Sequence, residues 1–350
     1  MKIFNIAVLP GDGIGPDVIR EGVGVLRAVE RRLEGVRFDL CEFSVGAGEY
    51  LRGGDPLPEA TFEECKSFDA ILLGAMGLPD VRWPNGTEMA PQLDLRERLE
   101  LYAGVRPIYL YNPIHSPLRS YGSGEIDFVI FRENTEGMFA SRKGTCPPDA
   151  DEVCDTLRIT RLASERLFRA AFREAERRRG LVTLIDKANV LPSMAFFRRV
   201  FDHIAEEFPK VTGEKIYVDA SALYLVQNPR RFDVIVSENL FGDILSDLAA
   251  GLIGGMGMAP SGDIGDRHAV FQPSHGSAPD IAGLGIANPV ATVLSVAMML
   301  DWLPDEETRR GGALVRSAVQ RVLAEPGCVT RDLGGSLSTG EMGARIAEEI

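Results

Sequence analysis

The sequence has no long apolar run, no paired cysteine motif and no excess of positive charge. Its longest apolar stretches, residues 248–260 and 288–300, fall short of the roughly 20 residues that span a bilayer, so we expect buried helices there and no membrane partner. Five scattered cysteines without C-x-x-C spacing argue against a disulfide framework or a zinc site. The net charge of -13 argues against nucleic acid as a partner.

Room for a targeting segment is also lacking. A strand is predicted to begin within a few residues of Met1, which leaves no space for a signal peptide. Together with the unpaired cysteines, this indicates a cytoplasmic protein.

What the sequence does contain is an alternation of apolar strands and amphipathic helices. A chain of 350 residues is longer than one core usually supports, so two domains are expected. Runs rich in valine, isoleucine and leucine predict buried strands over residues 6–10, 36–45, 69–75, 127–134, 181–189, 215–220 and 232–239. This alternation predicts an α/β fold.

The clearest predicted helix covers residues 161–180. Its apolar side chains recur at helical spacing at Leu162, Leu167, Ala171 and Ala175. Gly180 is the candidate C-cap. The preceding stretch, residues 140–160, is polar and contains Pro147 and Pro148, and two interpretations stay open for it: a protruding arm and a plain surface loop.

A glycine-rich turn follows the first predicted strand. Gly11, Gly13 and Gly15 precede Pro16, a residue that suits the first turn of a helix. The dinucleotide fingerprint has the spacing G-x-G-x-x-G, whereas this turn reads G-x-G-x-G-P and contains Asp12, whose carboxylate would repel phosphates. The turn is either a pyrophosphate cradle or a tight turn that lines another part of a site.

Three arginines lie beside apolar segments, at Arg96, Arg106 and Arg132. A guanidinium group binds a carboxylate through two parallel hydrogen bonds. Three of them together would suit a di- or tricarboxylate, which an acidic protein would otherwise repel. The alternative for each is an ordinary surface charge, except for Arg132, which ends a buried run at a predicted sheet edge.

Two aspartates share one face of a predicted helix. Asp243 and Asp247 are four residues apart, so their carboxylates repel one another unless a cation binds both. With Asp219 they are candidate ligands of Mg2+ or Mn2+, which prefer oxygen donors. The alternative is that Asp243 merely stabilises a helix N-terminus.

Two further segments carry polar residues beside apolar runs. Lys187 follows the run at 181–186 and is either a general base or a member of a salt bridge. The run that begins at His275 is rich in glycine and other small residues, whose exposed backbone N–H groups suit phosphate contacts. Asp280 in the same run would accept hydrogen bonds from ribose hydroxyls.

Six motifs, in order, resemble the β-decarboxylating dehydrogenases, the family of isopropylmalate, isocitrate, homoisocitrate, tartrate and D-malate dehydrogenases. The motifs are GDGIGPDV at 11–18, LRERLELYAGVRP at 95–107, RENTEG at 132–137, DKANVL at 186–191, the segment 218–247, and HGSAPDIAGLGIANP at 275–289. The similarity runs from about residue 7 to residue 303.

The resemblance implies a two-lobed α/β fold like that of isopropylmalate dehydrogenase, with mixed parallel sheets, flanking helices and no standard Rossmann fold. The large, cofactor-binding lobe would consist of residues 1–100 and 251–350, and the small lobe of residues 101–250. Residues 140–160 would be an arm that clasps the partner of a homodimer with shared active sites. The glycine-rich turn would lie at the cofactor cleft without cradling the pyrophosphate.

The resemblance also implies a role for each candidate residue. The substrate would be a hydroxy di- or tricarboxylate of the 3-substituted malate type, bound by Arg96, Arg106 and Arg132. Lys187 would accept the hydroxyl proton, and the ligands of Mg2+ or Mn2+ would be Asp219, which is also a catalytic residue, Asp243 and Asp247. NAD would accept a hydride from C2 before the β-carboxylate is lost. The residues expected to bind NAD are His275, Gly276, Ser277, Ala278, Pro279, Asp280, Asn288 and Ile14.

Two positions depart from the family pattern. The catalytic tyrosine expected to protonate the enol is replaced by Phe139, which has no hydroxyl. Gln92 stands where isopropylmalate enzymes carry a leucine, so a polar or absent substituent on the substrate is indicated. The substrate stays open among 3-isopropylmalate, homoisocitrate or isocitrate, and tartrate or D-malate. The rival interpretations are a non-catalytic, regulatory family member and a metal-dependent hydrolase.

Overall fold

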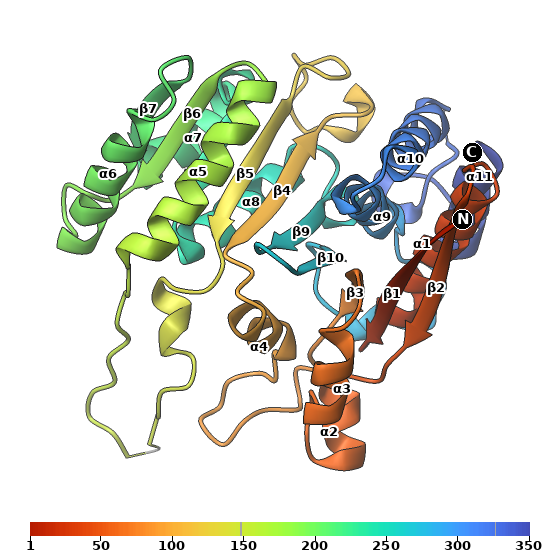
Figure 1. Ribbon diagram of the computed structural model, residues 1–350, viewed down its shortest axis with the longest axis horizontal. Coiled ribbons are helices and arrows are strands. Elements are labelled where there is room, and N and C mark those ends of the chain that lie inside the picture. The colour runs from red at the N-terminus through yellow and green to blue at the C-terminus, as the bar shows by residue number, and fades with distance from the viewer. Residues whose placement is uncertain (148, 326) are drawn as a thin grey trace. The chain divides into compact units, whose positions relative to one another are not determined.

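The computed structural model describes residues 1–147, 149–325 and 327–350, so Pro148 of the polar stretch lies outside it. The described chain forms two compact units (Figure 1). Unit 1 comprises Met1–Leu99, Gly254–Gly262 and Asp266–Ile350. Unit 2 comprises Glu100–Ile253 and Asp263–Gly265. The short segment 263–265 in unit 2 was not predicted from the sequence.

Unit 1 contains a mostly parallel set of strands covered by helices. Its strands lie in the order β2-β1-β3-β10-β9, and β1 is parallel to both β2 and β3. Their bounds are β1 Lys2–Gly11, β2 Val36–Glu42, β3 Ala70–Ala75, β10 Ala269–Pro273 and β9 Pro260–Ile264, whose last two residues belong to unit 2. The helices are α1 Gly15–Glu30, α2 Ala47–Gly53, α3 Glu59–Cys65, α4 Pro91–Arg98, α9 Val290–Trp302, α10 Glu306–Ala324 and α11 Thr339–Glu348.

Unit 2 is a mixed sheet with a pair of helices on each face. The strand order is β4-β5-β8-β6-β7; β4 is antiparallel to β5, and the other neighbours are parallel. The strands are β4 Ala103–Tyr109, β5 Asp127–Glu133, β6 Leu181–Asp186, β7 Thr212–Tyr217 and β8 Val234–Ser237. In Figure 1, α5 (Arg161–Arg177) and α6 (Pro192–Ala205) lie in front of these strands, and α7 (Val218–Gln227) and α8 (Asn239–Gly251) lie behind them.

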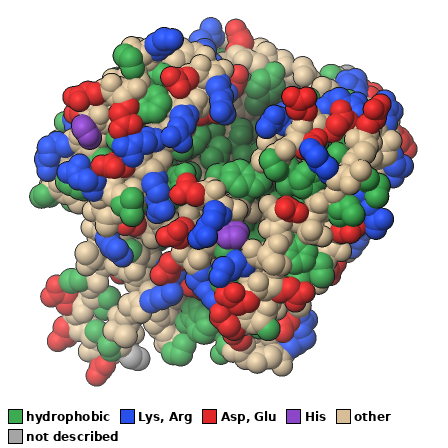
Figure 2. Space-filling model, in the orientation of Figure 1, with side chains coloured by type: hydrophobic (Ala, Val, Ile, Leu, Met, Phe, Trp, Pro, Cys, Tyr) green, Lys and Arg blue, Asp and Glu red, His purple; other side chains and the backbone are tan. Residues whose placement is uncertain are grey.

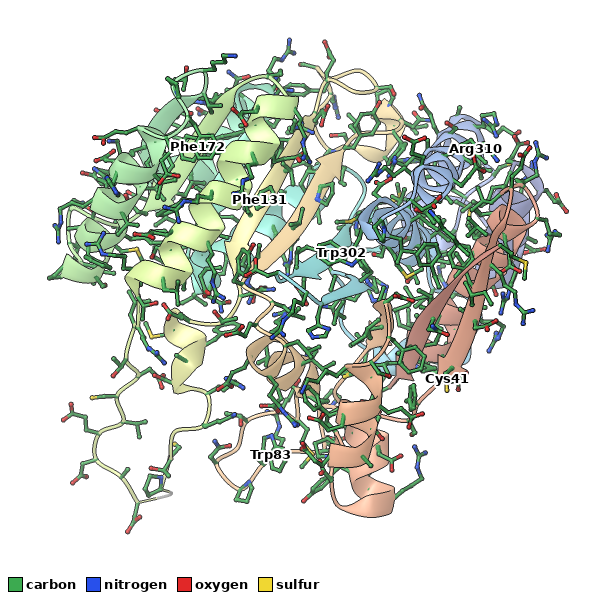
Figure 3. All side chains as sticks on the ribbon, viewed as in Figure 1. Cys41, Trp83, Phe131, Phe172, Trp302 and Arg310 are labelled. Atoms are coloured by element: carbon green, nitrogen blue, oxygen red, sulfur yellow. The ribbon has the colours of Figure 1, made fainter. Side chains whose placement is uncertain are left out.

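The core of unit 2 explains why α5 forms where it does. Thr160 caps the helix by accepting a hydrogen bond from the Ala163 N–H, which satisfies one of its free donors. Leu167, Ala171 and Ala175 are buried as predicted, in a core that includes Phe131 and Phe172, both labelled in Figure 3. The prediction for Leu162 was wrong, because the buried stripe begins one residue later and leaves Leu162 exposed. Gly180 is in the left-handed region at φ +79°, two residues past the C-cap.

The α/β fold class is confirmed, and the errors lie in short or irregular strands. β4, β9 and β10 were missed; β4 contains Gly104 and Pro107, and β9 has the sequence PSGDI, residue types that are depleted in strands. Six predicted strands were too long, because residues 43–45, 69, 134, 187–189, 218–220, 232–233 and 238–239 lie outside the observed strands. The apolar run at 288–300 is largely the buried helix α9 as expected. The run at 248–260 is not one helix, since α8 ends at Gly251.

Neither apolar run leads to a membrane span, because the described residues contain no helix with the length and hydropathy to cross a bilayer. The surface of α5 and α6 carries basic and acidic side chains interspersed with one another (Figure 2). The described parts of the polar stretch, residues 140–147 and 149–160, extend away from the strands of unit 2 (Figure 1). Ser141 ties the two sides of this loop together, because its hydroxyl bonds both the N–H and the C=O of Thr156.

Candidate active site

Arg132 is held in one orientation at the end of β5. Its side chain is only 2% exposed, and its Nε and Nη2 groups donate to Asn239 Oδ1 at 2.9 and 2.6 Å. Nη1 donates to Asp243. Gly242 makes room for the stem, since a Cβ at that position would lie 2.8 Å from Arg132 Cγ. The guanidinium is thus fixed with one edge toward the carboxylates of α8.

Arg106 reaches the same helix from the neighbouring strand, β4. Its Nη1 group donates to the Ser246 hydroxyl and lies 3.5 Å from Asp243 Oδ1 and 3.6 Å from Asp247 Oδ1. The Arg106 and Arg132 side chains therefore converge on one face of α8, which places two of the three predicted carboxylate-binding arginines together.

Sequence reasoning missed two residues of this cluster, Asn239 and Ser246. Both belong to a polar stripe on α8, which has an otherwise largely apolar sequence; the stripe consists of Asn239, Asp243, Ser246 and Asp247. Residues at i, i+4 and i+7 or i+8 lie on one face of a helix. This spacing was the available signal, and it would have identified both residues.

The two carboxylates of the stripe are suited to a cation. Burial raises the pKa of Asp247, and the like charge of Asp243 raises it further, against the opposing effect of Arg106. The Asp243 and Asp247 side chains keep 35% and 55% of their surface exposed, so their oxygens are accessible. Hard oxygen donors beside one another are the ligand type that Mg2+ and Mn2+ prefer.

Lys187 and Asp219 form a separate pair. Lys187 follows β6, and its Nζ atom donates to Asp219 Oδ1 at 2.7 Å; this hydrogen bond lowers the pKa of Asp219. The predicted position of Asp219 at a strand end was wrong: β7 stops at Tyr217, and Asp219 lies in the first turn of α7, where the helix dipole favours an acid. Within the described chain, no three His, Cys, Asp or Glu side chains converge as metal ligands.

Phe139, at the position of the family tyrosine, lies beside the arginine cluster. It belongs to a 3₁₀ turn, η2 (Met138–Ser141), and its ring centroid is 5.1 Å from the Arg132 guanidinium carbon. This is cation–π distance. The aromatic ring of Phe139 therefore contacts one of the predicted carboxylate-binding arginines, and it has no hydroxyl that could donate a proton.

Arg96 and Gln92 are both on α4 of unit 1. They are four residues apart and so share one helix face. Arg96 is buried. The Gln92 Oε1 atom is also buried and has no hydrogen-bond partner among the described residues, a state that costs about 1–3 kcal/mol unless a ligand satisfies it.

The glycine-rich turn in unit 1 is a tightly bonded structural turn. The Asp12 carboxylate accepts hydrogen bonds from the N–H groups of Ala47, Gly48 and Gly77, each at 2.8 Å. Gly13 has φ +59°, and a Cβ there would lie 1.9 Å from the Ser277 carbonyl oxygen. Of the two interpretations left open by the sequence, the tight turn fits, because the turn's own N–H groups at Asp12, Ile14 and Gly15 already donate to backbone carbonyl oxygens.

The turn packs directly on the predicted NAD-binding run. Ile14 donates its N–H to the Ser277 carbonyl at 2.8 Å and forms an apolar cluster with Val18 and Ala287. Ala278 is in the left-handed region at φ +36°, a strained conformation for a residue with a Cβ and one that often marks a ligand site. Of the residues predicted to bind NAD, Gly276, Pro279 and Asp280 are exposed.

His275 carries an unsatisfied nitrogen in this run. Burial lowers the pKa of its imidazole, so the ring is neutral at pH 7. Nδ1 lies 2.9 Å from the Gly276 carbonyl oxygen, which can only accept, so Nδ1 carries the proton. Nε2 is then an acceptor, and it is buried without a partner among the described residues. An amino group such as that of adenine would satisfy it.

Asn288 has a structural function at the end of this run. Its Nδ2 group donates to Asp332 at 3.0 Å, and its Oδ1 atom accepts from the Val290 N–H at 3.0 Å at the start of α9.

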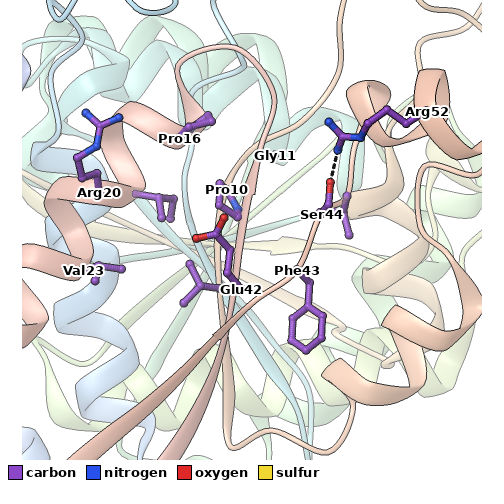
Figure 4. A pocket seen from close by; sticks show the side chains of 12 residues that line it. Pro10, Gly11, Pro16, Arg20, Val23, Glu42, Phe43, Ser44 and Arg52 are labelled. Atoms are coloured by element: carbon purple, nitrogen blue, oxygen red, sulfur yellow. Dashed lines mark hydrogen bonds between the residues drawn. The ribbon is translucent and has the colours of Figure 1, made fainter.

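A cavity of about 570 Å³ lies on another side of the glycine-rich turn. Arg20, Glu42 and Arg52 are among the residues that line it (Figure 4). None of residues 275–288 lines it, so this cavity is not the predicted NAD site.

The chain is similar to known dehydrogenases over nearly its whole length. The chain is 45% identical to the 3-isopropylmalate dehydrogenase of Moorella thermoacetica, with 99% of both chains covered. It is 42% identical to the 3-isopropylmalate/3-methylmalate dehydrogenase of Methanocaldococcus jannaschii, again over 99% of both. The crystal structure of isocitrate dehydrogenase from Methylococcus capsulatus matches with a TM-score of 0.89 at 36% identity, covering 99% of each chain.

The fold and the relatives define a β-decarboxylating dehydrogenase, an enzyme that oxidises a CH–OH group. The chain belongs to the isocitrate/isopropylmalate dehydrogenase family, whose model matches residues 5–346. The resemblance found in the six motifs is thereby confirmed.

Proposed function

We propose that this chain catalyses the oxidative decarboxylation of a 3-substituted malate, using NAD and Mg2+ or Mn2+, as a homodimer with shared active sites. The observation that carries the proposal is the convergence of Arg106 and Arg132 on the Asp243 and Asp247 carboxylates. Fixed guanidinium groups beside helix-borne carboxylates suit a polycarboxylate substrate bound together with a cation.

Each residue then has a chemical role. Arg106 and Arg132 bind and orient the substrate carboxylates, and Arg96 is assigned to the same task from the family resemblance. Lys187 accepts the C2 hydroxyl proton while the C2 hydride leaves. The bound cation, held by Asp219, Asp243 and Asp247, supplies a Lewis acid, and NAD at residues 275–280 supplies the hydride acceptor.

The homodimer is supported by apolar side chains beside the candidate metal ligands. On α7, Leu223 and Val226 are 53% and 45% exposed, and they lie four and seven residues after Asp219, on the same helix face. On α8, which contacts α7, Ile244 is 60% exposed between Asp243 and Asp247. A second copy that covers this surface would bring its own Lys187 and Asp219 toward the arginine cluster.

The proposal is tested by assaying the purified chain with NAD+ and Mn2+ against a panel of malates. The panel contains 3-isopropylmalate, 3-methylmalate, isocitrate, homoisocitrate, D-malate and tartrate. We expect NADH and CO2 in equal amounts from at least one of them, and loss of both products with a chelator. If no member yields NADH, the proposal is wrong; hydrolysis of a phosphate ester with Mn2+ alone would instead support a hydrolase. Effector binding without turnover would identify a regulatory member.

The first prediction concerns Gln92 and substrate choice. Replacing Gln92 by Leu removes the unpartnered amide oxygen from the Arg96 face of α4. We expect kcat/KM for 3-isopropylmalate to rise by about 10-fold or more, since matching one branched apolar group in a pocket is worth about 1–3 kcal/mol. Steady-state kinetics on the panel measure this. D-malate, which has no 3-substituent, is the control, and its kcat/KM should change less than about twofold. An equal change in kcat/KM for both substrates would contradict a role of Gln92 in substrate choice.

The second prediction concerns the choice of dinucleotide. The exposed Asp280 carboxylate would accept a hydrogen bond from a ribose 2′-hydroxyl and repel a 2′-phosphate, so we expect kcat/KM with NADP+ to be about 100-fold lower than with NAD+. Asp280→Lys should reverse much of this preference. Glu348→Lys, an identical charge change at an exposed position of α11, should leave it unchanged. Comparable use of both dinucleotides by the unmodified enzyme would refute the assignment.

A further inference from the structure

An ion pair between the end of β6 and helix α6 has no part in the predicted chemistry. Asp186 is the last residue of β6 and is completely buried. Its two carboxylate oxygens accept hydrogen bonds from Nη2 and Nε of Arg198, on α6, each at 2.7 Å. Asp186 Oδ1 also accepts from the Ala188 N–H at 3.0 Å, so the carboxylate fixes the backbone on both sides of Lys187.

The same arginine contacts the neighbouring strand. Its guanidinium carbon is 5.2 Å from the centroid of the Tyr217 ring, within cation–π distance. Tyr217 is the last residue of β7 and is the register partner of Asp186 in the parallel pair β6–β7. Arg198 therefore contacts both Asp186 and Tyr217, the paired last residues of β6 and β7.

The candidate catalytic residues follow directly after this pair. Lys187 is one residue past Asp186, and Asp219 is two residues past Tyr217. Their side chains meet at 2.7 Å, although each is on a segment that has just left its strand. The distance between the backbone after β6 and the backbone after β7 determines whether the Lys187 Nζ atom can reach the Asp219 carboxylate.

We propose that Arg198 is a positioning residue: by pairing with Asp186 and stacking on Tyr217, it holds the ends of β6 and β7 so that Lys187 and Asp219 are presented together. This inference rests on the proposed function for the meaning of that pair. A small displacement of a catalytic group is costly, because a misplacement of about 1 Å can lower the rate about 100-fold.

A similar ion pair at the opposite end of the parallel strands of this sheet provides a matched control. Asp233, just before β8, is also buried, and its Oδ1 atom accepts from Arg178 Nε at 2.8 Å. Its Oδ2 atom accepts from the Arg179 N–H at 2.8 Å. Because β6 and β8 are parallel, this pair lies at the beginning of the strands, whereas Asp186 lies at the end where Lys187 emerges.

The test compares Arg198→Met, Arg198→Lys and the control Arg178→Met in the full-length protein. The first readout needs no substrate: acylation of Lys187 by an amine-specific reagent, followed by peptide mass spectrometry. In Arg198→Met the Lys187 Nζ group loses its fixed partner Asp219, and we expect labelling of Lys187 to be at least about threefold faster than in the wild type. In Arg178→Met the Lys187 labelling rate should stay within about twofold of the wild-type rate.

The second readout is the division between kcat and KM. Arg198→Met should lower kcat about 100-fold while the KM for NAD+ changes less than about twofold. Arg198→Lys keeps the charge but not the planar fork, so its kcat should be intermediate. Thermal unfolding of both methionine variants shows whether they are equally destabilised.

Two results would overturn the inference. One is wild-type labelling of Lys187 in Arg198→Met; the other is an equal loss of kcat in Arg178→Met, which would show a general effect of destabilisation. If the wild-type enzyme itself turns over no malate, the proposed function has failed, and the labelling comparison still decides whether Arg198 positions Lys187.

Discussion

Mixing inactive Lys187→Ala chains with inactive Asp243→Ala chains is expected to restore activity. In the proposed dimer, each active site takes Asp243 from one chain and Lys187 from the other. A mixed dimer then has one site with both residues intact and one with both changed. After random exchange, half of the dimers are mixed, so about a quarter of the wild-type activity should return. Each variant alone should be lower by about 1000-fold or more, since it lacks the base or a metal ligand.

The structure supplies the reason for choosing these two residues. Lys187 pairs with Asp219 in its own chain, while Asp243 contacts Arg106 and Arg132. The site residues thus fall into two groups within one chain: Lys187 with Asp219, and Asp243 with Arg106 and Arg132. Exposed apolar side chains lie beside both groups, on α7 and α8, where a partner would cover them.

A second mixture distinguishes a shared site from simple stabilisation of one variant by another. Lys187→Ala and Asp219→Ala belong to the same group, so a mixed dimer of these two has a defect in each site, and no activity should return. Light scattering checks that every mixture is dimeric. A fully active monomer, or recovery in both mixtures alike, would rule out the shared site.

The site was predictable from the sequence where a residue type and its position together restrict the chemistry. Arg132 ends a buried strand, and a buried arginine needs an anionic partner or a set of acceptors. Asp243 and Asp247 share a helix face at four-residue spacing, and their local sequence alone places them together. The structure brings these residues and Arg106 into one cluster.

Contacts between distant segments could not be predicted in the same way. Asp12 was recognised as hostile to phosphate, but the three N–H groups that it binds come from residues 47, 48 and 77. Likewise, the pairing of Asp186 with Arg198 depends on how α6 packs against β6. Nothing in the local sequence of either residue specifies its partner, because tertiary packing decides which donors face which carboxylate.

Errors in the predicted strands have a related cause. A run of β-branched residues predicts that a strand exists, but it does not mark where the strand ends. Residues 218–220 were predicted to continue the strand at β7, and they begin α7 instead. The error bears on the candidate site, since Asp219 projects from the first turn of α7 and not from a strand.

Replacing Phe139 by Tyr is expected to raise the steady-state rate by about 100-fold while leaving the first turnover unchanged. In the proposed mechanism, hydride transfer depends on Lys187 and the arginine cluster, which this replacement does not alter. Protonation of the enol at C3 needs an acid, and a positioned general acid is worth about 10²–10⁴-fold. Phe139 lies against Arg132, where the tyrosine ring would keep the cation–π contact and add a hydroxyl beside the bound substrate.

Rapid-mixing measurements of NADH formation check this prediction. The wild-type enzyme should show a burst of NADH followed by a slower steady rate, because product formation waits for a proton from water. Phe139→Tyr should remove the difference between the two phases by accelerating the second. Phe196→Tyr is the control. The Phe196 ring centroid also lies near an arginine, 5.6 Å from the Arg161 guanidinium carbon, but Phe196 is outside the proposed site. If the wild type shows no burst and Phe139→Tyr behaves like this control, another group donates the proton, and the missing hydroxyl at position 139 carries no catalytic penalty.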